Sequence, residues 1–252
     1  MFGHRGAAAV LPENTLPSFA FALAAGATHL ELDVHATNDG HVVVCHDPSV
    51  DRTTPGAGEI RHMTLAEVQS LDASARFAPL PGLAAQPFTA PLSIPTLAEV
   101  LLAFPEARLN IDLKQTDPPI EPLVVDLLRA HGALDRALLT SETDAVVARV
   151  RALAPDAITG SSAGEVISFV GVAGGAAPPG RALQVPVDVH GFPVVTEPFV
   201  ERAHALGLEV HVWTIDDPAE MESLIAIGVD GIITNVPHLA VERLLTAPRP
   251  RP

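Results

Sequence analysis

The stretch Leu30-Glu31-Leu32-Asp33-Val34 is the best guide to the fold, because its apolar and acidic residues alternate strictly. Side chains of a strand point alternately to its two faces, so the aliphatic residues share one face and the two carboxylates share the other. In a parallel barrel the aliphatic face packs against helices, and the acids face the lumen near the carboxyl ends of the strands. Two buried carboxylates repel each other and need a cation or a shared proton. The pattern favours a site for a hard divalent ion, Mg²⁺ or Ca²⁺; two solvated acids at a strand end are the alternative.

A second stretch, Asn110-Ile111-Asp112-Leu113-Lys114, has the same alternation. Its three polar residues share one face, so Asp112 can supply a third carboxylate and Lys114 can meet an anionic oxygen. Lys114 is the single lysine among 15 basic residues, which indicates a need for a compact ammonium group in place of a planar guanidinium. A structural Asp–Lys pair is the alternative interpretation.

Two histidines follow predicted strands. His4-Arg5 comes after a first strand that only three residues can form, and His46-Asp47 comes after an apolar run. Two imidazoles facing each other across a barrel rim can divide acid and base work near neutral pH. Arg5 can fork onto phosphate or carboxylate oxygens. Taken singly, each histidine is more often structural than catalytic.

Three further residues lie near these positions. Glu13 lies just outside a predicted helix, where we expect it to pair with Arg5 or reach the site as a supporting residue. Asn14 or Thr15 can cap that helix, and capping is the role expected for Asn14. Trp213 ends a predicted strand, where an indole can form the floor of a substrate pocket or simply pack.

Short apolar runs alternate with helical patterns along the whole chain. The expected strands are 1–3, 28–34, 42–46, 108–114, 137–140, 157–161, 182–186, 209–214 and 231–234. The expected helices are 15–25, 96–104, 120–131, 143–154, 164–172, 196–206, 218–227 and 236–245. If 42–46 is an extra hairpin strand, eight strand–helix units of about 31 residues remain, the size of one βα repeat. The fold class expected is α/β, a (β/α)8 TIM barrel. A doubly wound sheet is the alternative, which the absence of G-x-G-x-x-G disfavours.

The segment 47–95 interrupts this rhythm between the second strand and its helix, and it contains seven prolines. We expect it to be an insertion that covers the strand ends, where barrels place their active sites; a surface loop is the alternative. Residues 1–252 then form a single barrel domain with the insertion 47–95. The tail 247–252 is expected to fray.

The composition of the chain excludes several classes of binding partner. The net charge of −15 repels nucleic acid and anionic membranes, so neither is expected as a partner. A lone cysteine, Cys45, excludes an internal disulfide framework. The sequence has no leader-like start and no apolar run of the ~20 residues that a membrane span needs. We therefore expect a cytoplasmic protein with a small-molecule substrate and no membrane insertion; the sequence leaves its oligomeric state open.

Taken together, these motifs resemble the glycerophosphodiester phosphodiesterase family. The resemblance runs nearly end to end, and the first fifty residues are the most specific. It rests on the motifs His4-Arg5-Gly6, Pro12-Glu13-Asn14-Thr15, Glu31-Leu32-Asp33-Val34, His46-Asp47, Arg52-Thr53-Thr54, Asn110-Ile111-Asp112-Leu113-Lys114, Val212-Trp213-Thr214-Ile215 and Gly228–Pro237. It implies a (β/α)8 barrel with an insertion after the second strand. It also implies hydrolysis of glycerophosphodiesters to glycerol 3-phosphate and an alcohol, with a divalent cation.

The resemblance also implies roles for particular residues. The ion ligands correspond to Glu31, Asp33 and Asp112, and the catalytic histidines to His4 and His46. Arg5 and Lys114 correspond to phosphate contacts, and Trp213 to the pocket wall.

Two positions depart from the family pattern. Asp112 stands where many members have Glu, and Asn235 stands where Asp is usual. An aspartate at the first position is also found in related phospholipase D toxins. A lysophospholipase D, with an apolar surface at Phe77–Phe88, is therefore one alternative. A barrel that binds phosphorylated ligands without catalysis is the other.

Overall fold

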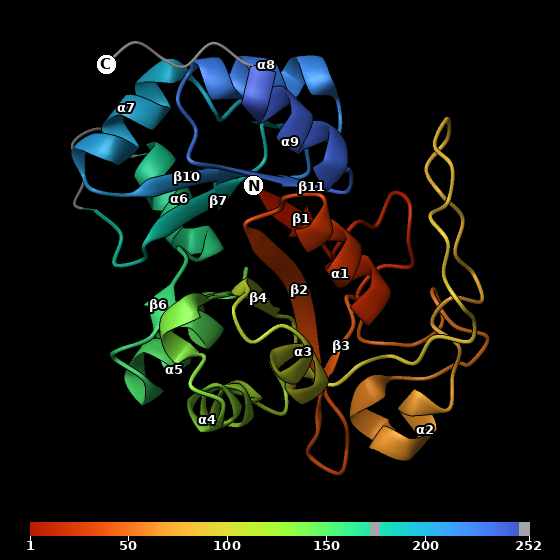
Figure 1. The fold of residues 1–252 in the computed structure, drawn as a ribbon. Coiled ribbons are helices and arrows are strands. Elements are labelled where there is room, and N and C mark those ends of the chain that lie inside the picture. The colour runs from red at the N-terminus through yellow and green to blue at the C-terminus, as the bar shows by residue number, and fades with distance from the viewer. Residues whose placement is uncertain (172–176, 247–252) are drawn as a thin grey trace.

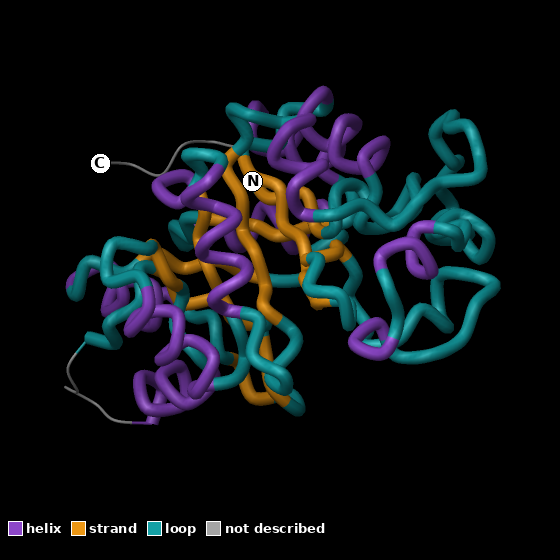
Figure 2. The backbone as a smooth tube through the Cα atoms, turned by 90° about the horizontal axis from the view of Figure 1, so that it is seen from below, coloured by secondary structure: helices purple, strands orange, loops and turns teal. Residues whose placement is uncertain are grey.

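The computed structural model describes residues 1–171 and 177–246, and eight parallel strands of these residues form a nearly closed barrel (Figures 1 and 2). Hydrogen bonds join the strands in the order β6-β5-β4-β2-β1-β11-β10-β7. The two ends of this sheet meet where the Ser161 amide donates to the Ala182 carbonyl at 2.9 Å. The (β/α)8 TIM barrel expected from the sequence is confirmed. Its strands are β1 (Phe2–His4), β2 (His29–Ala36), β4 (Arg108–Leu113), β5 (Ala137–Thr140), β6 (Ile158–Thr159), β7 (Ala182–Val185), β10 (Glu209–Val212) and β11 (Gly231–Thr234).

Helices surround the strands, as the view from below shows (Figure 2). Their starts follow local capping chemistry. Thr96 and Glu99 form a reciprocal capping box at α3, and the Asp217 side chain accepts two amide hydrogens at the start of α8. The helices are α1 (Leu16–Ala24), α3 (Leu97–Ala103), α4 (Glu121–Ala130), α5 (Asp144–Leu153), α6 (Ala163–Gly171), α7 (Glu197–Ala205), α8 (Pro218–Ala226) and α9 (Pro237–Thr246). A short 3₁₀ helix, η2 (Leu134–Arg136), precedes β5.

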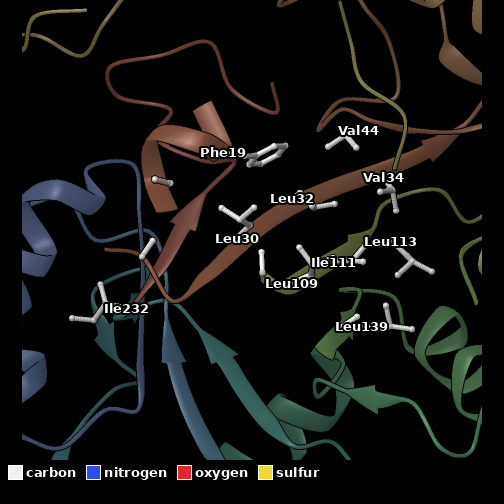
Figure 3. Close-up of a cluster of buried hydrophobic side chains, with 14 of the residues drawn as sticks. Phe19, Leu30, Leu32, Val34, Val44, Leu109, Ile111, Leu113, Leu139 and Ile232 are labelled. Atoms are coloured by element: carbon white, nitrogen blue, oxygen red, sulfur yellow. The ribbon is translucent and has the colours of Figure 1, made fainter. Parts of the chain in front are cut away.

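The alternation of β2 produces the predicted division of faces. Leu30, Leu32 and Val34 are fully buried, and they belong to the core that packs against the helices (Figure 3). Phe19 of α1 and Ile111 of β4 belong to the same cluster. Burial of aliphatic area is the main favourable term in folding, so this face holds β2 in a fixed register.

The short strand β3 (Val42–Val44) pairs antiparallel with β2, as expected for a hairpin. The insertion that follows contains η1 (Ile60–His62) and α2 (Leu65–Gln69), and it stands to one side of the barrel in both views (Figures 1 and 2). It encloses a small core of its own, which includes Val50, Ile60 and Val68. Its outer segment is tied to the loop after β1, because the Leu80 amide donates to the Ala9 carbonyl at 2.9 Å.

A hairpin between β7 and α7 is absent from the predicted elements. The strands β8 (Asp188–Val189) and β9 (Phe192–Pro193) pair across His190 and Gly191, which have φ values of 53° and 80°. Two successive positive φ values are typical of the tight turn that joins twisted strands. His190-Gly191 is not one of the Asn-Gly, Asp-Gly or Gly-Gly pairs that most strongly indicate such a turn, so the sequence has no strong turn signal there.

None of the helices within residues 1–171 and 177–246 is both long enough and apolar enough to traverse a bilayer. The predicted fraying of 247–252 concerns a segment outside the described residues.

Candidate active site

A cavity of about 410 Å³ lies at the carboxyl ends of the strands. Side chains from several strands that are far apart in the sequence meet in its wall. All eight residues that the sequence predicts for catalysis, ion binding and substrate contact line it: His4, Arg5, Glu31, Asp33, His46, Asp112, Lys114 and Trp213. The insertion 47–95 contributes no residue to this wall. It reaches the border of the site through Arg52.

Asp33 and Asp112 lie side by side because they are register partners on β2 and β4. The Lys114 Nζ atom lies between them, 3.3 Å from Asp33 Oδ1 and 2.6 Å from Asp112 Oδ2. Burial acts to lower the pKa of Lys114, but Asp112 and then Asp33 outweigh it and raise that pKa. The ammonium group is therefore held in its charged form.

The Asp33 carboxylate is charged for a related reason. Burial acts to raise its pKa, but the cations Lys114 and Arg5 outweigh burial and lower it. The Arg5 Nε atom lies 3.3 Å from Asp33 Oδ2. Asp112 differs, since burial raises its pKa in spite of Lys114.

Glu31 lies deeper in the lumen, where its Oε2 atom accepts the Arg5 amide hydrogen at 2.9 Å. The same oxygen is 3.9 Å from His4 Nε2. Burial, and then the neighbouring Asp33 charge, raise the pKa of Glu31 well above its ordinary value. A further positive charge, beyond Lys114 and Arg5, would favour the ionised forms of these acids.

The three carboxylates fit a hard divalent ion by their chemistry. All are oxygen donors on one cavity, and Asp112 Oδ1 is buried without a hydrogen-bond partner among the described residues. In residues 1–171 and 177–246, no three His, Cys, Asp or Glu side chains are already arranged around a common ion position. The Lys114 ammonium lies between two of the three acids.

The His4 ring is oriented by Asn235. The Asn235 Nδ2 group donates to Asp216 Oδ2 at 2.7 Å, which fixes the orientation of the amide. Asn235 Oδ1 therefore accepts from His4 Nδ1 at 2.7 Å, and the neutral ring keeps its lone pair on Nε2. Burial, and then Arg5, lower the pKa of His4, so this neutral form is favoured. Asn235, which departs from the family pattern, thus still positions His4.

His46 is oriented in a similar way by its neighbour. Its Nδ1 atom lies 2.7 Å from Asp47 Oδ1, so the ring donates from Nδ1 and leaves Nε2 for other contacts. Its backbone carbonyl accepts from His35 Nε2 at 3.1 Å. His35 lies on the same face of β2 as the acids, and this hydrogen bond helps to hold the backbone of His46 in position.

The loop between β1 and α1 corrects one prediction. Thr15 is the N-cap of α1 and makes no capping hydrogen bond with its side chain. Asn14, expected to cap, instead donates from Nδ2 to Asp33 Oδ2 at 3.0 Å. It adopts a φ of 55°, which asparagine tolerates better than most residues, and this backbone conformation turns its side chain inward. Asn14 thus contacts a carboxylate of the candidate site through its side chain.

The Arg5 guanidinium is held by Glu13, as expected. Arg5 Nη1 lies 3.0 Å from Glu13 Oε1. Arg5 also has a positive φ of 50°, an uncommon conformation for this residue and one found most often at functional sites.

The far wall of the cavity is more apolar. Val166 and Ile167 of α6 line it together with Trp213, and Ile167 is 70% exposed. The rings of Phe77 and Phe88 instead contact each other, with centroids 6.0 Å apart, and neither lines the cavity. The apolar surface at the site is therefore on α6 and not at Phe77–Phe88.

Sequence reasoning did not nominate several polar residues of the site. Asp216 holds Asn235, and Ser161 and Gln184 line the cavity. All three follow or end barrel strands, and polar residues at such positions commonly face a barrel's active site. The position of these polar residues at the ends of predicted strands was therefore the signal that could have identified them.

The fold and the site define a class, a (β/α)8-barrel enzyme with acids, imidazoles and cations around one cavity at the strand ends. The sequence model of the glycerophosphoryl diester phosphodiesterase family matches residues 4–239. The chain belongs to this family, a family of phosphoric diester hydrolases.

Individual relatives agree with this assignment. The chain is 33% identical to the glycerophosphodiester phosphodiesterase of Caldanaerobacter subterraneus subsp. tengcongensis, over 96% of each chain. A crystal structure of glycerophosphodiester phosphodiesterase from Agrobacterium tumefaciens superposes with a TM-score of 0.79 at 27% identity, covering 96% of this chain and 98% of that one. The Oleispira antarctica phosphodiesterase, solved in complex with the product sn-glycerol-3-phosphate, shares the fold with a TM-score of 0.79 at 24% identity, covering 97% and 96%.

Proposed function

We propose that this protein hydrolyses glycerophosphodiesters to glycerol 3-phosphate and an alcohol, with a divalent cation and two histidines. One observation supports the proposal above others: the three predicted ion ligands Glu31, Asp33 and Asp112 line a single cavity together with two imidazoles and two cationic side chains. A site that only binds a phosphorylated ligand has no need of a paired acid and base. Family membership independently favours the same reaction.

Glu31, Asp33 and Asp112 would hold the ion, Mg²⁺ or Ca²⁺. When bound, it would supply positive charge against the oxygens of the phosphodiester, where charge grows in the transition state. Lys114, already charged between two of these acids, would then be free to turn toward a phosphate oxygen.

His4 and His46 would share the proton transfers. Each ring has its Nδ1 bonded to a neighbour, and each keeps Nε2 for a reacting oxygen. One imidazole removes the proton from the attacking oxygen, and the other protonates the departing alkoxide. The attacker is either water or a glycerol hydroxyl, which would first form a cyclic phosphate.

Arg5 and Lys114 would bind the phosphate group of the substrate, and Trp213 would contact its organic part. Arg5 is already placed by its ion pair with Glu13. A fixed guanidinium gains affinity for a phosphate because little conformational freedom is lost on binding.

A second candidate substrate is a lysophospholipid. The wall formed by Val166, Ile167 and Trp213 gives an acyl chain an apolar surface beside the phosphodiester site. Because Ile167 is 70% exposed, its contact with a chain would remove apolar area from water.

A substrate panel tests both candidates. We expect release of glycerol 3-phosphate from glycerophosphocholine and glycerophosphoethanolamine, activity that EDTA abolishes and added Mg²⁺ or Ca²⁺ restores. Faster turnover of lysophosphatidylcholine, with phosphate retained on the lipid, would support the second candidate. Binding of these compounds with no product from any of them would contradict both.

A further inference from the structure

Arg52 belongs to the motif Arg52-Thr53-Thr54, which the proposed reaction leaves without a role. Its guanidinium lies where the insertion meets the barrel and binds two carboxylates at once. Nη1 and Nη2 lie 2.7 Å from the two oxygens of Glu13. Nε lies 2.6 Å from Asp47 Oδ2.

Each of these carboxylates has a second partner in the cavity wall. Asp47 accepts from His46 Nδ1 at 2.7 Å, and Glu13 accepts from Arg5 Nη1 at 3.0 Å. Hydrogen bonds therefore run without interruption from Arg5, which follows His4 in the chain, to the imidazole of His46. Arg52 is the middle member of that series.

Charge explains why the middle member is a cation. Glu13 and Asp47 bear charges of the same sign and repel each other, and Arg52 is a cation that binds both of them. Burial acts to raise the pKa of both acids, but Arg52 outweighs it and lowers both, with help from Arg5 at Glu13 and from His46 at Asp47. Both acids are thus kept ionised and able to accept hydrogen bonds.

The shape of the arginine side chain matters as well as its charge. The guanidinium uses three nitrogens to bind two carboxylates in different directions. A lysine ammonium is a point charge without this fixed fork, so it cannot hold both acids in the same geometry.

We propose that Arg52 is a positioning residue of the active site. By binding Glu13 and Asp47 together, it fixes Arg5 and His46 relative to each other, although it does not line the cavity itself. The inserted segment thereby contributes to catalysis from outside the barrel. This inference rests on the function proposed above for the same site.

The first test compares three variants with the wild type in glycerol 3-phosphate release from glycerophosphocholine at saturating Mg²⁺. We expect Arg52→Gln to lower kcat by about 10²-fold, the size of effect that a small misplacement of catalytic groups produces. Arg52→Lys should fall between Arg52→Gln and the wild type. Arg61→Gln is the matched control, because Arg61 lies in the same insertion but does not line the cavity, and it forms an ion pair with Glu59 at 2.6 Å. The kcat of this variant should match that of the wild type.

A double-mutant cycle with Asp47→Asn tests whether Arg52 acts through Asp47. The loss of kcat caused by Asp47→Asn should be much smaller in the Arg52→Gln background than in the wild type, because the two residues act as a unit. Wild-type kcat in Arg52→Gln, or strictly additive losses in the cycle, would overturn the proposal.

Histidine-ring ¹H–¹⁵N NMR spectra give a readout that does not depend on turnover. The wild type and Arg61→Gln should show His46 in the Nδ1–H tautomer, whereas Arg52→Gln should show a mixture of tautomers because Asp47 is released. An unchanged His46 tautomer in Arg52→Gln would refute the positioning role. If the wild type releases no product, the proposed function fails, and the NMR comparison still decides the role of Arg52.

Discussion

His4 and His46 show how single residues are prepared for chemistry by their neighbours. Asn235 accepts from one ring and Asp47 from the other, and both contacts leave Nε2 available. The burial that lowers the pKa of His4 also makes this imidazole a neutral acceptor near pH 7.

The first prediction concerns these rings. His4→Ala and His46→Ala should each lower kcat by about 10²–10⁴-fold, the usual contribution of general acid–base catalysis. Steady-state release of glycerol 3-phosphate measures this loss. His62→Ala, at an exposed histidine of the insertion, serves as the control and should retain wild-type turnover. Nearly full activity in either catalytic variant would remove that histidine from the mechanism.

The second prediction concerns Cys45, the free cysteine directly before His46. It is 6% exposed, and burial raises the pKa of its thiol to about 12. Because the thiolate is the reactive form, native protein at pH 8 should not react with a thiol reagent within minutes, whereas guanidinium-unfolded protein should react completely. Rapid labelling of the native protein, measured by mass spectrometry, would show that this part of the structure opens.

At the level of secondary structure, helix α8 is stabilised by a cap at its N-terminus. Asp217 is the N-cap of helix α8, and its Oδ1 atom accepts from the amides of Ala219 and Glu220 at 2.8 Å and 3.0 Å. The same connection after β10 contains Trp213 and Asp216, so the cap helps to define a loop of the site.

Removal of this cap gives the third prediction. Asp217→Ala should lower the free energy of unfolding by about 1 kcal/mol, the usual worth of an N-cap side chain. Urea denaturation followed by circular dichroism measures the change. Asp126→Ala, an exposed position within α4, should change stability by less than about 0.5 kcal/mol. Equal effects of the two substitutions would argue against a capping role for Asp217.

An ion pair between Arg181 and Glu209 joins the starts of β7 and β10 at the end of the barrel opposite the site, and His211 of β10 also contacts Glu209. Glu209 Oε1 lies 2.7 Å from Arg181 Nη2, and Glu209 Oε2 lies 3.2 Å from His211 Nε2. The hydrogen bond from His211, and then that from Arg181, lower the pKa of Glu209 to about 2, although burial opposes them.

The fourth prediction follows from this shift. A carboxyl whose pKa is lower in the folded than in the unfolded state stabilises the fold above its unfolded value of 4.5, and this stabilisation is lost as pH falls toward about 2. The stability difference between the wild type and Glu209→Gln should therefore shrink as pH falls from 5 to 2. Urea midpoints across this range measure it, and a constant difference would contradict the assignment. Solvent screening keeps the effect small, because both Glu209 and Arg181 are substantially exposed.

At the scale of the whole molecule, the site depends on the closed barrel. Strands β1, β2 and β4 bring acids, a histidine and cations to one side of the cavity, while Trp213 and α6 form the more apolar side. The chain carries a net charge of −15, so the cationic residues of the cavity are a local exception that suits an anionic substrate.

The fifth prediction concerns ion binding by the whole protein. An ion that binds the folded but not the unfolded chain stabilises the fold, by about 2.7 kcal/mol at one hundred times its Kd. Mg²⁺ or Ca²⁺ should therefore raise the Tm of EDTA-treated protein in a concentration-dependent way. Asp33→Asn should abolish this shift and Asp217→Ala should preserve it. A Tm that neither ion changes would refute the proposed carboxylate site.

The features that depend on local periodicity could be predicted from the sequence. Alternation in 30–34 and 110–114 was sufficient to predict which side chains face the lumen, and the rhythm of strands and helices predicted the barrel. The expected residues Glu31, Asp33, Asp112, His4 and His46 accordingly meet at one cavity. The direction of successive side chains along a strand alternates by geometry alone, so these conclusions needed no knowledge of distant contacts.

How those residues are held depends on contacts between distant segments, which the folded chain alone reveals. Asn14 reaches Asp33, Asp216 fixes Asn235, and Arg52 joins Glu13 to Asp47. Each contact links segments whose approach depends on closure of the barrel, positive-φ turns or the path of the insertion. No local pattern encodes such distances, because they result from the packing of the whole chain.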